Sequence, residues 1–284
     1  MNVRSPPAQP DWPALSGDEL RRLTDFLYQK TGMIFGENKR YYIERRVNQR
    51  IAETGASGFR SYFPHLVAEP AEHEALINAF TINETYFYRE EHQLAALSRD
   101  ILPSLTQGRK PGDLIRIWSM PCSSGEEPYS IAIWLLENWP LVDAFHIEIV
   151  GSDIDTAAIL QAGAGIYGER SLSRLPADIV DRYFEPKQGH TRKIIDDIRE
   201  SVHFVPVNLV EKDAMIRMGR FDVIFCRNLL IYFDDASRLA AAGHLFDSLN
   251  PGGYLCLGHT ESMARISDRF AMARFDDAIV YRRP

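Results

Sequence analysis

The chain of 284 residues lacks the features that mark several specialised classes of protein. No apolar run approaches the roughly 20 residues of a membrane-spanning helix, and residues 1–13 contain no apolar core of a secretory signal. The three cysteines, Cys122, Cys226 and Cys256, are far apart and form no Cys-x-x-Cys pair. We therefore expect a cytoplasmic protein without membrane insertion, disulfides or a zinc site.

Metal-binding spacing and an excess of positive charge are missing as well. The eight histidines show neither His-Glu-x-x-His nor His-x-His spacing, which argues against a metal centre. The net charge is −7, whereas broad nucleic-acid binding needs a basic surface that neutralises phosphates. We expect a monomer with no nucleic-acid partner.

Residues 14–80 contain apolar side chains at helical spacing and no strand pattern, which predicts a small all-helical domain. Ser16 followed by Glu19 is the signature of a capping box, and Gly32 is placed to end the first helix. Three more helices are predicted over about 38–53 (ending at Gly55), 59–67 and 71–80. The Pro-rich residues 1–13 before this domain are expected to be a disordered tail.

From Leu114 onward, short apolar runs alternate with helical stretches, which predicts a doubly wound parallel sheet. The expected strands are 114–118, 147–150, 221–225 and 254–258, the expected helices are 128–137, 155–162 and 234–249, and a terminal hairpin is expected over 270–275 and 278–282. Residues 193–195 and 202–205 can pair as an antiparallel hairpin. We therefore expect an inserted β-subdomain over about 168–205.

The loop after the first strand, residues 119–128, is rich in small residues that let a ligand approach the N-terminus of the next helix. It is not the Gly-x-Gly-x-x-Gly of diphosphate-binding folds. Glu126 and Glu127 would repel a diphosphate but suit a cationic ligand such as S-adenosyl-L-methionine (SAM). Alternatively, both glutamates only favour the helix dipole in its first turn.

Two aspartates follow the second strand, and we assign them different roles. An acid at this strand end can accept hydrogen bonds from the ribose hydroxyls of an adenosyl ligand, and Asp153 is the candidate. Asp155 is better placed to cap the helix that follows. This pattern alone does not separate a methyltransferase from a dehydrogenase. The polar residues that end the fourth-strand stretch, Arg227-Asn228, and the Pro-Gly-Gly turn at 251–253 before a strand favour a methyltransferase.

Several stretches make the chain resemble the chemotaxis receptor methyltransferases, the CheR family, over about Leu15 to Tyr281. The matching stretches are Asn83–Arg89, Trp118–Ser130, Ser152–Asp155, Val207–Leu209, Phe225–Phe233 and Gly258–Ser262. The resemblance implies an α/β Rossmann-like SAM methyltransferase sheet (93–284), a small N-terminal helical domain (14–80) and a linker at 81–92 that contributes to the cofactor site. It also implies transfer of a methyl group from SAM to glutamates of chemoreceptor signalling domains, with S-adenosyl-L-homocysteine (SAH) as product.

The resemblance also implies roles for individual residues. The cofactor pocket would be lined by Asn83, Thr85, Arg89, Glu127, Asp153, Asn208, Leu209, Asn228 and Leu229, with Arg89 and Tyr232 as catalytic residues nearest the methyl group. We expect Tyr232 to orient the acceptor oxygen, and Arg89 to hold the carboxylate of either the acceptor or the cofactor. His259 and Glu261 either belong to this site or only connect neighbouring strand ends.

A basic stretch in the second helix is a candidate receptor-docking surface. On an ideal helix, Lys39, Arg46 and Arg50 fall within a sector of roughly 40°. Arg40 and Arg45 widen this basic surface, which would attract an acidic helical receptor. Alternatively, these side chains form a solvated face paired with Glu37, Glu44 and Glu53.

The chain departs from the family pattern in one hairpin loop. The hairpin loop at 187–192 is shorter than in members that bind a C-terminal receptor pentapeptide, so we expect direct engagement of the receptor without such a tether.

Methylation of a nucleic-acid base is a rival function. It is disfavoured because Asn228 is followed by Leu229-Leu230 instead of the Pro-Pro that precedes a stacking aromatic. A non-catalytic adaptor that senses SAM or SAH is the alternative from another class.

Overall fold

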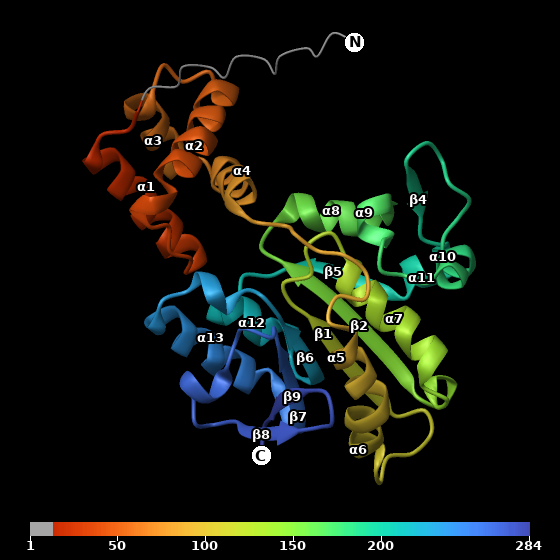
Figure 1. Cartoon of the computed structure of the whole chain (residues 1–284). Helices are drawn as coiled ribbons and strands as arrows, with labels where there is room; N and C mark the ends of the chain where they lie inside the picture. Colours follow the sequence, from red (N-terminus) through yellow and green to blue (C-terminus); the bar gives the residue numbers. More distant parts are fainter. Residues whose placement is uncertain (1–13) are drawn as a thin grey trace. The chain divides into compact units, whose positions relative to one another are not determined.

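The computed structural model describes residues 14–284, which divide into two compact units. The first unit contains the residues up to Lys30 together with Ile34–Phe80, and the second contains Thr31–Met33 and Thr81–Pro284. The predicted disordered tail, residues 1–13, lies outside the described residues. Figure 1 traces the chain through both units.

The first unit is built from helices whose ends follow the capping signals of the sequence. Its elements are α1 (Gly17–Thr31), η1 (Glu37–Lys39), α2 (Arg40–Thr54), α3 (Phe59–Ala68) and α4 (Pro70–Phe80). At the start of α1, the backbone N–H of Ser16 bonds the Glu19 carboxylate and the N–H of Glu19 bonds the Ser16 hydroxyl, which is a capping box. Gly32 and Gly55 follow α1 and α2 with positive φ. The four predicted helices are confirmed.

The second unit contains a seven-stranded sheet in the order β5-β2-β1-β6-β7-β9-β8. Its strands are β1 (Leu114–Ser119), β2 (His146–Asp153), β5 (Val202–Pro206), β6 (Phe221–Cys226), β7 (Leu249–Leu257), β8 (Ala271–Arg274) and β9 (Ile279–Arg282). The first five strands in this order run parallel, and β9 and β8 are antiparallel. Every residue of β6 is buried, as expected for a central strand covered on both faces. The predicted Rossmann-like sheet and terminal hairpin are confirmed.

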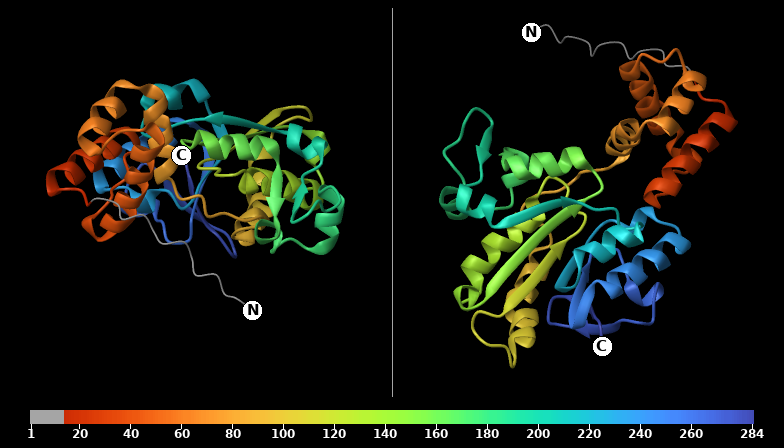
Figure 2. Two further views of the ribbon diagram at one scale, coloured as in Figure 1. Left: turned by 90° about the horizontal axis from the view of Figure 1, so that it is seen from above. Right: turned by 180° about the vertical axis from the view of Figure 1, so that it is seen from behind.

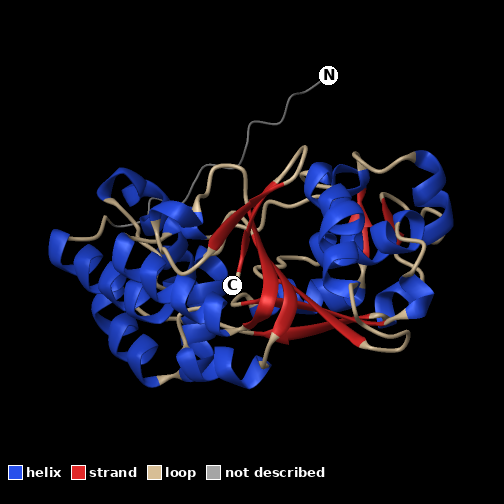
Figure 3. Cartoon of the chain, turned by 90° about the horizontal axis from the view of Figure 1, so that it is seen from below, coloured by secondary structure: helices blue, strands red, loops and turns tan. Residues whose placement is uncertain are grey.

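Helices lie on both faces of this sheet (Figures 2 and 3). They are α5 (Glu91–Ala96), the π-helical η2 (Leu97–Ile101), α6 (Leu102–Thr106), α7 (Glu126–Asn138), α8 (Thr156–Ala164), α12 (Lys212–Met218) and α13 (Asp235–Asp247), with short turns η3 (Val142–Ala144), η4 (Leu230–Tyr232) and η5 (Met263–Arg265). Trp134 of α7 donates its indole N–H to the Ser98 hydroxyl of η2 (3.1 Å), which joins two of these helices. Among residues 14–284, no helix is long and apolar enough to cross a membrane.

The inserted antiparallel subdomain is present, but its strands pair differently from the prediction. β3 (Ile166–Gly168) pairs with β4 (Thr191–Lys193), with α9 (Glu169–Leu172) and α10 (Ala177–Tyr183) between them.

The segment 202–205, predicted to pair with 193–195, was assigned wrongly. It follows α11 (Asp196–Glu200) and forms β5, which runs parallel to β2 at the edge of the main sheet. Because only Val202 of β5 is buried, its pattern is that of a half-exposed strand. A hairpin strand and an edge strand share this pattern.

The strand β7 begins earlier than predicted. Leu249 pairs with Phe221 and Tyr254 pairs with Val223, so the residues between Leu249 and Tyr254 form an irregularity inside the strand. The Pro-Gly-Gly sequence is this irregularity and not a turn before the strand. Gly253 fits there because a Cβ would meet the Asp222 carbonyl oxygen at 3.0 Å.

Candidate functional site

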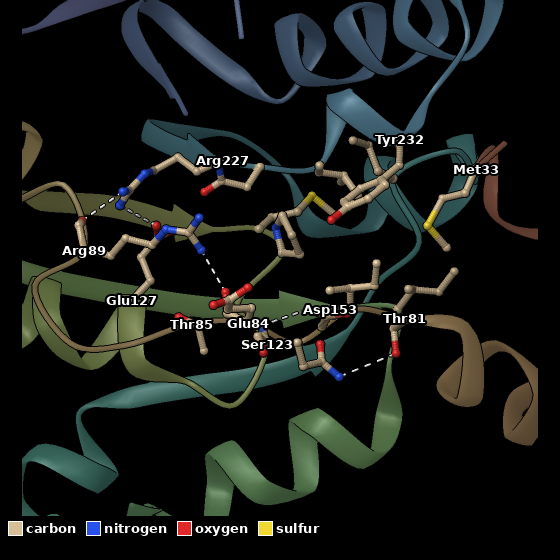
Figure 4. A pocket seen from close by; sticks show the side chains of 18 of the residues that line it. Met33, Thr81, Glu84, Thr85, Arg89, Ser123, Glu127, Asp153, Arg227 and Tyr232 are labelled. Carbon is tan, nitrogen blue, oxygen red and sulfur yellow. Dashed lines mark hydrogen bonds and ion pairs between the residues drawn. The ribbon is translucent and has the colours of Figure 1, made fainter. Parts of the chain in front are cut away.

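The carboxyl ends of the parallel strands and one additional segment enclose a cavity (Figure 4). Its walls come from the residues that follow β1, β2, β5 and β6, and from residues 81–89, which lead into α5. The space between them, counted out to the open mouth, is about 1040 Å³. Open α/β sheets bind their ligands at this edge.

The cavity brings together every residue predicted for the cofactor and catalytic sites. Its lining includes Asn83, Thr85, Arg89, Glu127, Asp153, Asn208, Leu209, Asn228, Leu229 and Tyr232. These residues come from segments far apart in the sequence. They meet because parallel strands place their carboxyl ends at one edge of the sheet.

Asp153 is the last residue of β2 and is almost fully buried. Its carboxylate accepts hydrogen bonds from the backbone N–H groups of Ser123 (2.8 Å) and Asp155 (2.9 Å). Burial raises the pKa of Asp153 to about 6, although these two bonds favour the ionised form. A carboxylate has about four lone-pair positions, so it can still accept hydroxyl donors of a ligand.

Asp155 caps α8, as predicted, and also binds the segment that begins at Thr81. One carboxylate oxygen accepts the backbone N–H of Ala158 (3.0 Å). The other accepts the Thr81 hydroxyl (2.5 Å) and the Asn83 side-chain amide (2.7 Å). The start of α8 and one wall of the cavity are therefore held by the same side chain.

The backbone on both sides of Arg89 adopts a conformation that non-glycine residues rarely show. The φ angle is 57° at Tyr88 and 55° at Glu90. Tyr88 is buried, and its backbone N–H donates to the Ser130 hydroxyl of α7 (3.0 Å). Arg89 lines the cavity and donates to the Glu84 carbonyl oxygen (2.7 Å). No carboxylate among residues 14–284 pairs with Arg89, so its charge is available to a ligand carboxylate.

Glu127, in the first turn of α7, is held by partners from two strands. One carboxylate oxygen accepts the Ser119 hydroxyl of β1 (2.7 Å), and the other accepts an N–H of Arg227, which follows β6 (2.7 Å). Arg227 is buried and also lies 3.2 Å from the Glu90 carboxylate. Figure 4 shows the Arg227 and Glu127 side chains in the same part of the cavity.

The cavity is less acidic than the sequence of the first loop indicates. Glu126 is buried outside the cavity lining and bonds the hydroxyls of Ser124 (2.7 Å) and Ser171 (2.9 Å). Burial also raises the pKa of Glu126. The expectation that both glutamates face a cationic ligand was wrong for Glu126, and the charge of Glu127 is shared with Arg227.

Glu261 connects the ends of β6 and β7 and does not line the cavity. Its carboxylate accepts the backbone N–H groups of Asn228 (2.7 Å), Leu230 (2.8 Å) and Gly258 (2.9 Å). His259 does not line the cavity either. Of the two alternatives left open for this pair, Glu261 follows the second, a connection between strand ends. The His259 ring lies 2.9 Å from the Glu90 carboxylate instead.

Tyr232 ends η4 and is half-buried in the cavity wall. Burial raises the pKa of its hydroxyl, and the nearby charge of Arg89 opposes this only in part. The hydroxyl therefore keeps its proton at neutral pH and can donate a hydrogen bond to a ligand oxygen.

Some lining residues were not predicted. Arg227 stands beside Asn228 in the sequence, but a single sequence does not show that it approaches Glu127. Met33, after α1, reaches the cavity through a bridge to Phe233, for which the sequence carries no signal.

The predicted docking arginine Arg50 belongs to the interior of the helical unit. Its guanidinium bonds both carboxylate oxygens of Glu72 (3.0 and 2.5 Å) and also pairs with Glu53, and its side chain is 17% exposed. The buried Tyr62 hydroxyl donates to the same Glu72 carboxylate (2.7 Å). The predicted helix sector did not include Glu72 on α4, and this ion pair argues against a docking role for Arg50.

The exposed side of α2 is rotated about the helix axis from the predicted sector by roughly 100°, the step between successive residues. Tyr41, Arg45 and Gln49 are exposed, and Tyr41 is 65% exposed. Lys39 and Arg46 are half-buried, and the Arg46 guanidinium lies 4.3 Å from the centre of the Tyr42 ring. Arg45 is therefore the most accessible cation of this helix.

The groups in the cavity fit SAM. SAM carries two ribose hydroxyls, an ammonium, a carboxylate and a base. Asp153 can accept the hydroxyls, Glu127 can accept the ammonium, and Arg89 can pair with the carboxylate. Leu209 and Met120 supply buried apolar surface for a base.

Two family models match the chain one after the other. The model described as CheR methyltransferase, all-alpha domain, matches residues 18–81. The model described as CheR methyltransferase, SAM binding domain, matches residues 83–279. The second match alone covers more than half of the chain.

Curated relatives match over nearly the same span. Chemotaxis protein methyltransferase 2 of Vibrio cholerae is 49% identical over 265 residues, which cover 93% of this chain and 92% of that protein. Chemotaxis protein methyltransferase 2 of Pseudomonas aeruginosa is 35% identical, with 88% of each chain covered. The chemotaxis protein methyltransferase of Escherichia coli is 32% identical, with 91% and 89% covered. The chain therefore belongs to the CheR family and is a SAM-dependent methyltransferase.

Proposed function

We propose that the protein transfers the methyl group of SAM to glutamate side chains in the cytoplasmic signalling domains of chemoreceptors, forming methyl esters for sensory adaptation. The observation that carries the proposal is the presence of Arg89 and Tyr232 in one cavity with the groups suited to SAM. The names of the relatives, which are chemotaxis protein methyltransferases, support the substrate class.

The reaction does not require the protein to remove a proton from the acceptor. Bound SAM supplies a methyl group that its sulfonium makes electrophilic. A glutamate side chain has a pKa of about 4.3 and is already ionised at neutral pH, so no general base is needed. The protein has to align the acceptor and exclude water. In this proposal, Tyr232 donates a hydrogen bond to the acceptor oxygen, and Arg89 holds the carboxylate of either the acceptor or SAM.

We propose that the receptor is engaged directly and not through a C-terminal pentapeptide. The short loop before β4 supports this. Gln188 and Thr191 exchange backbone hydrogen bonds (2.9 and 3.1 Å), so only Gly189 and His190 form the turn between them. A turn this tight offers little backbone for binding an extended peptide.

We also propose that α2 contributes to receptor docking, through Arg45 with Lys39 and Arg46. The exposure of Arg45 and Tyr41 supports this assignment. Arg50 is left out because its charge is bound by Glu72 inside the unit.

The decisive experiment is transfer of labelled methyl from SAM to receptor-rich membranes, followed by a test for base-labile methyl on glutamate. We expect label on receptor glutamate with the wild type. Tyr232→Phe should lower turnover by about 10²-fold, because an orienting hydrogen bond is lost, while the dissociation constant for SAH stays unchanged. SAM binding without transfer would favour the adaptor alternative, and unchanged turnover of Tyr232→Phe would exclude the orienting role.

A further inference from the structure

Of the two arginines in the wall of the cavity, Arg227 is the more deeply buried, with a side chain that is 3% exposed. One terminal nitrogen donates to the Glu127 carboxylate (2.7 Å). The other donates to the backbone carbonyl of Arg89 (2.8 Å) and lies 3.2 Å from the Glu90 carboxylate. One guanidinium therefore contacts the start of α7 and the turn that carries Arg89.

These contacts fix two groups that face the ligand. Glu127 can accept a ligand donor only in the orientation that Arg227 and Ser119 impose on it. The turn at Arg89 is strained, because Tyr88 and Glu90 both have positive φ. A strained turn persists only where surrounding contacts hold it, and Arg227 bonds its central carbonyl.

The same contacts also set the charge beside the ligand. Glu127 and Glu90 share the single positive charge of Arg227. Burial alone would raise the pKa of Glu90, but the charge of Arg227 and the hydrogen bond from His259 outweigh it and lower the pKa. Glu90 can therefore stay ionised. Two carboxyl groups face one guanidinium here, so acidic groups outnumber basic groups in this cluster.

We propose that Arg227 is a positioning residue that sets the preference of the cavity between the sulfonium cofactor and its thioether product. The inference rests on the proposed use of this cavity for SAM. SAM and SAH differ by one methyl group and one positive charge, so the ratio of their dissociation constants reports the local electrostatic potential. A contribution to folding alone would change the affinity for both ligands equally.

The test measures dissociation constants for SAM and SAH by calorimetry at pH 8, in the wild-type protein, three variants and one control variant. Arg227→Gln removes the cation, so both ligands bind more weakly while the ratio of the SAH constant to the SAM constant rises about fourfold. That is the effect of a unit charge at roughly 10 Å in a medium of effective dielectric constant about 40. Glu127→Gln removes an acid, and the ratio falls by about the same factor. Arg227→Lys keeps the charge, so the ratio stays close to the wild-type value.

Arg116→Gln is the matched control. Arg116 is an ion-paired arginine of the same sheet, 2.6 Å from Glu148, and it does not line the cavity. Its loss should leave the ratio unchanged. A wild-type ratio in a folded Arg227→Gln variant overturns the proposal. If that variant does not fold, the Glu127→Gln ratio decides, and an unchanged value overturns the proposal. Failure of the wild type to bind either ligand would overturn the proposed function instead.

Discussion

Two acids, Asp153 in the cavity lining and Glu90 outside it, differ in how they respond to burial. The Asp153 carboxylate accepts hydrogen bonds from the backbone N–H groups of Ser123 and Asp155, and burial raises its pKa to about 6. Glu90 is also partly buried, but Arg227 is the main reason that its pKa is lowered. A neighbouring cation thus decides which acid titrates near neutral pH, and ligand binding should respond to pH through Asp153.

We expect the affinity for SAH to rise with pH and to level off above about pH 7. The ligand hydroxyls bond the ionised form of Asp153, so binding below pH 6 must first release a proton. The affinity should fall by up to about tenfold for each pH unit below 6. Calorimetry between pH 5 and 8 measures this, and an affinity independent of pH would contradict it.

The Asp153 carboxyl should also make folding stability depend on pH, but stability should fall as pH rises, whereas the affinity for SAH rises. The folded pKa lies above the ordinary value of 3.8, so the folded state holds the proton more tightly than the unfolded state. The stabilisation from Asp153 is complete below pH 4 and is lost as pH rises through about 6. Asp153→Asn, the control for both effects, should bind SAH weakly with no pH dependence in this range, and should remove this loss of stability.

Among the elements, those with a clear period were predictable and those that depend on a neighbour were not. The four helices of the first unit and the strands β1, β2 and β6 follow from apolar spacing and capping residues. β5 was assigned to the wrong sheet because a five-residue strand with a single buried side chain does not specify a partner strand. The bulge in β7 depends on its pairing with β6, which periodicity does not show.

The site residues divide in the same way, into those predictable from their own strand and those that depend on contacts with other segments. Asp153 was predictable because it ends a buried strand in a parallel sheet, where such ends converge. Arg227 was not, because its role comes from contacts with Glu127 and Glu90, which lie on other segments. The ion pair of Arg50 was not predictable for the same reason, since Glu72 binds it from another helix.

Asp155 has two roles, as the cap of α8 and as the partner of the segment before α5, and substitutions should separate them. Asp155→Ala removes the cap of α8 together with the bonds to Thr81 and Asn83. We expect a loss of about 1 kcal/mol in the free energy of unfolding, and a roughly fivefold weaker affinity for SAH. Chemical denaturation and calorimetry measure the two effects.

Asp155→Asn is the control that separates the two effects. Asparagine caps helices about as well as aspartate, so stability should stay within a few tenths of a kcal/mol. Its single acceptor oxygen cannot serve both Ala158 and the pair Thr81 and Asn83. SAH should therefore bind about as weakly as to the alanine variant. Wild-type affinity in Asp155→Asn would show that these bonds do not shape the site.

On the scale of the whole molecule, charge is divided unevenly along the chain. Residues 14–80 contain nine basic and nine acidic side chains, so the net charge of −7 comes from the rest of the sequence. Within the neutral part, residues 39–50 contain five basic side chains and one acidic side chain. Arg50 of this stretch is neutralised inside the unit, and Arg45 is exposed. An acidic receptor surface would therefore be attracted to α2 more than to the molecule as a whole.

Charge reversal at Arg45 tests this attraction. We expect Arg45→Glu to lower kcat/KM for receptor methylation by roughly tenfold at low ionic strength, because steering by opposite charges speeds encounter. The difference from wild type should shrink as salt is added, since exposed charges are screened beyond about 10 Å at 0.1 M. The dissociation constant for SAH should not change. Arg60→Glu, which makes the same charge change at an exposed position of α3, is the control. If the two variants lose activity equally, or if the loss at Arg45 persists in high salt, α2 does not steer the receptor through its charge.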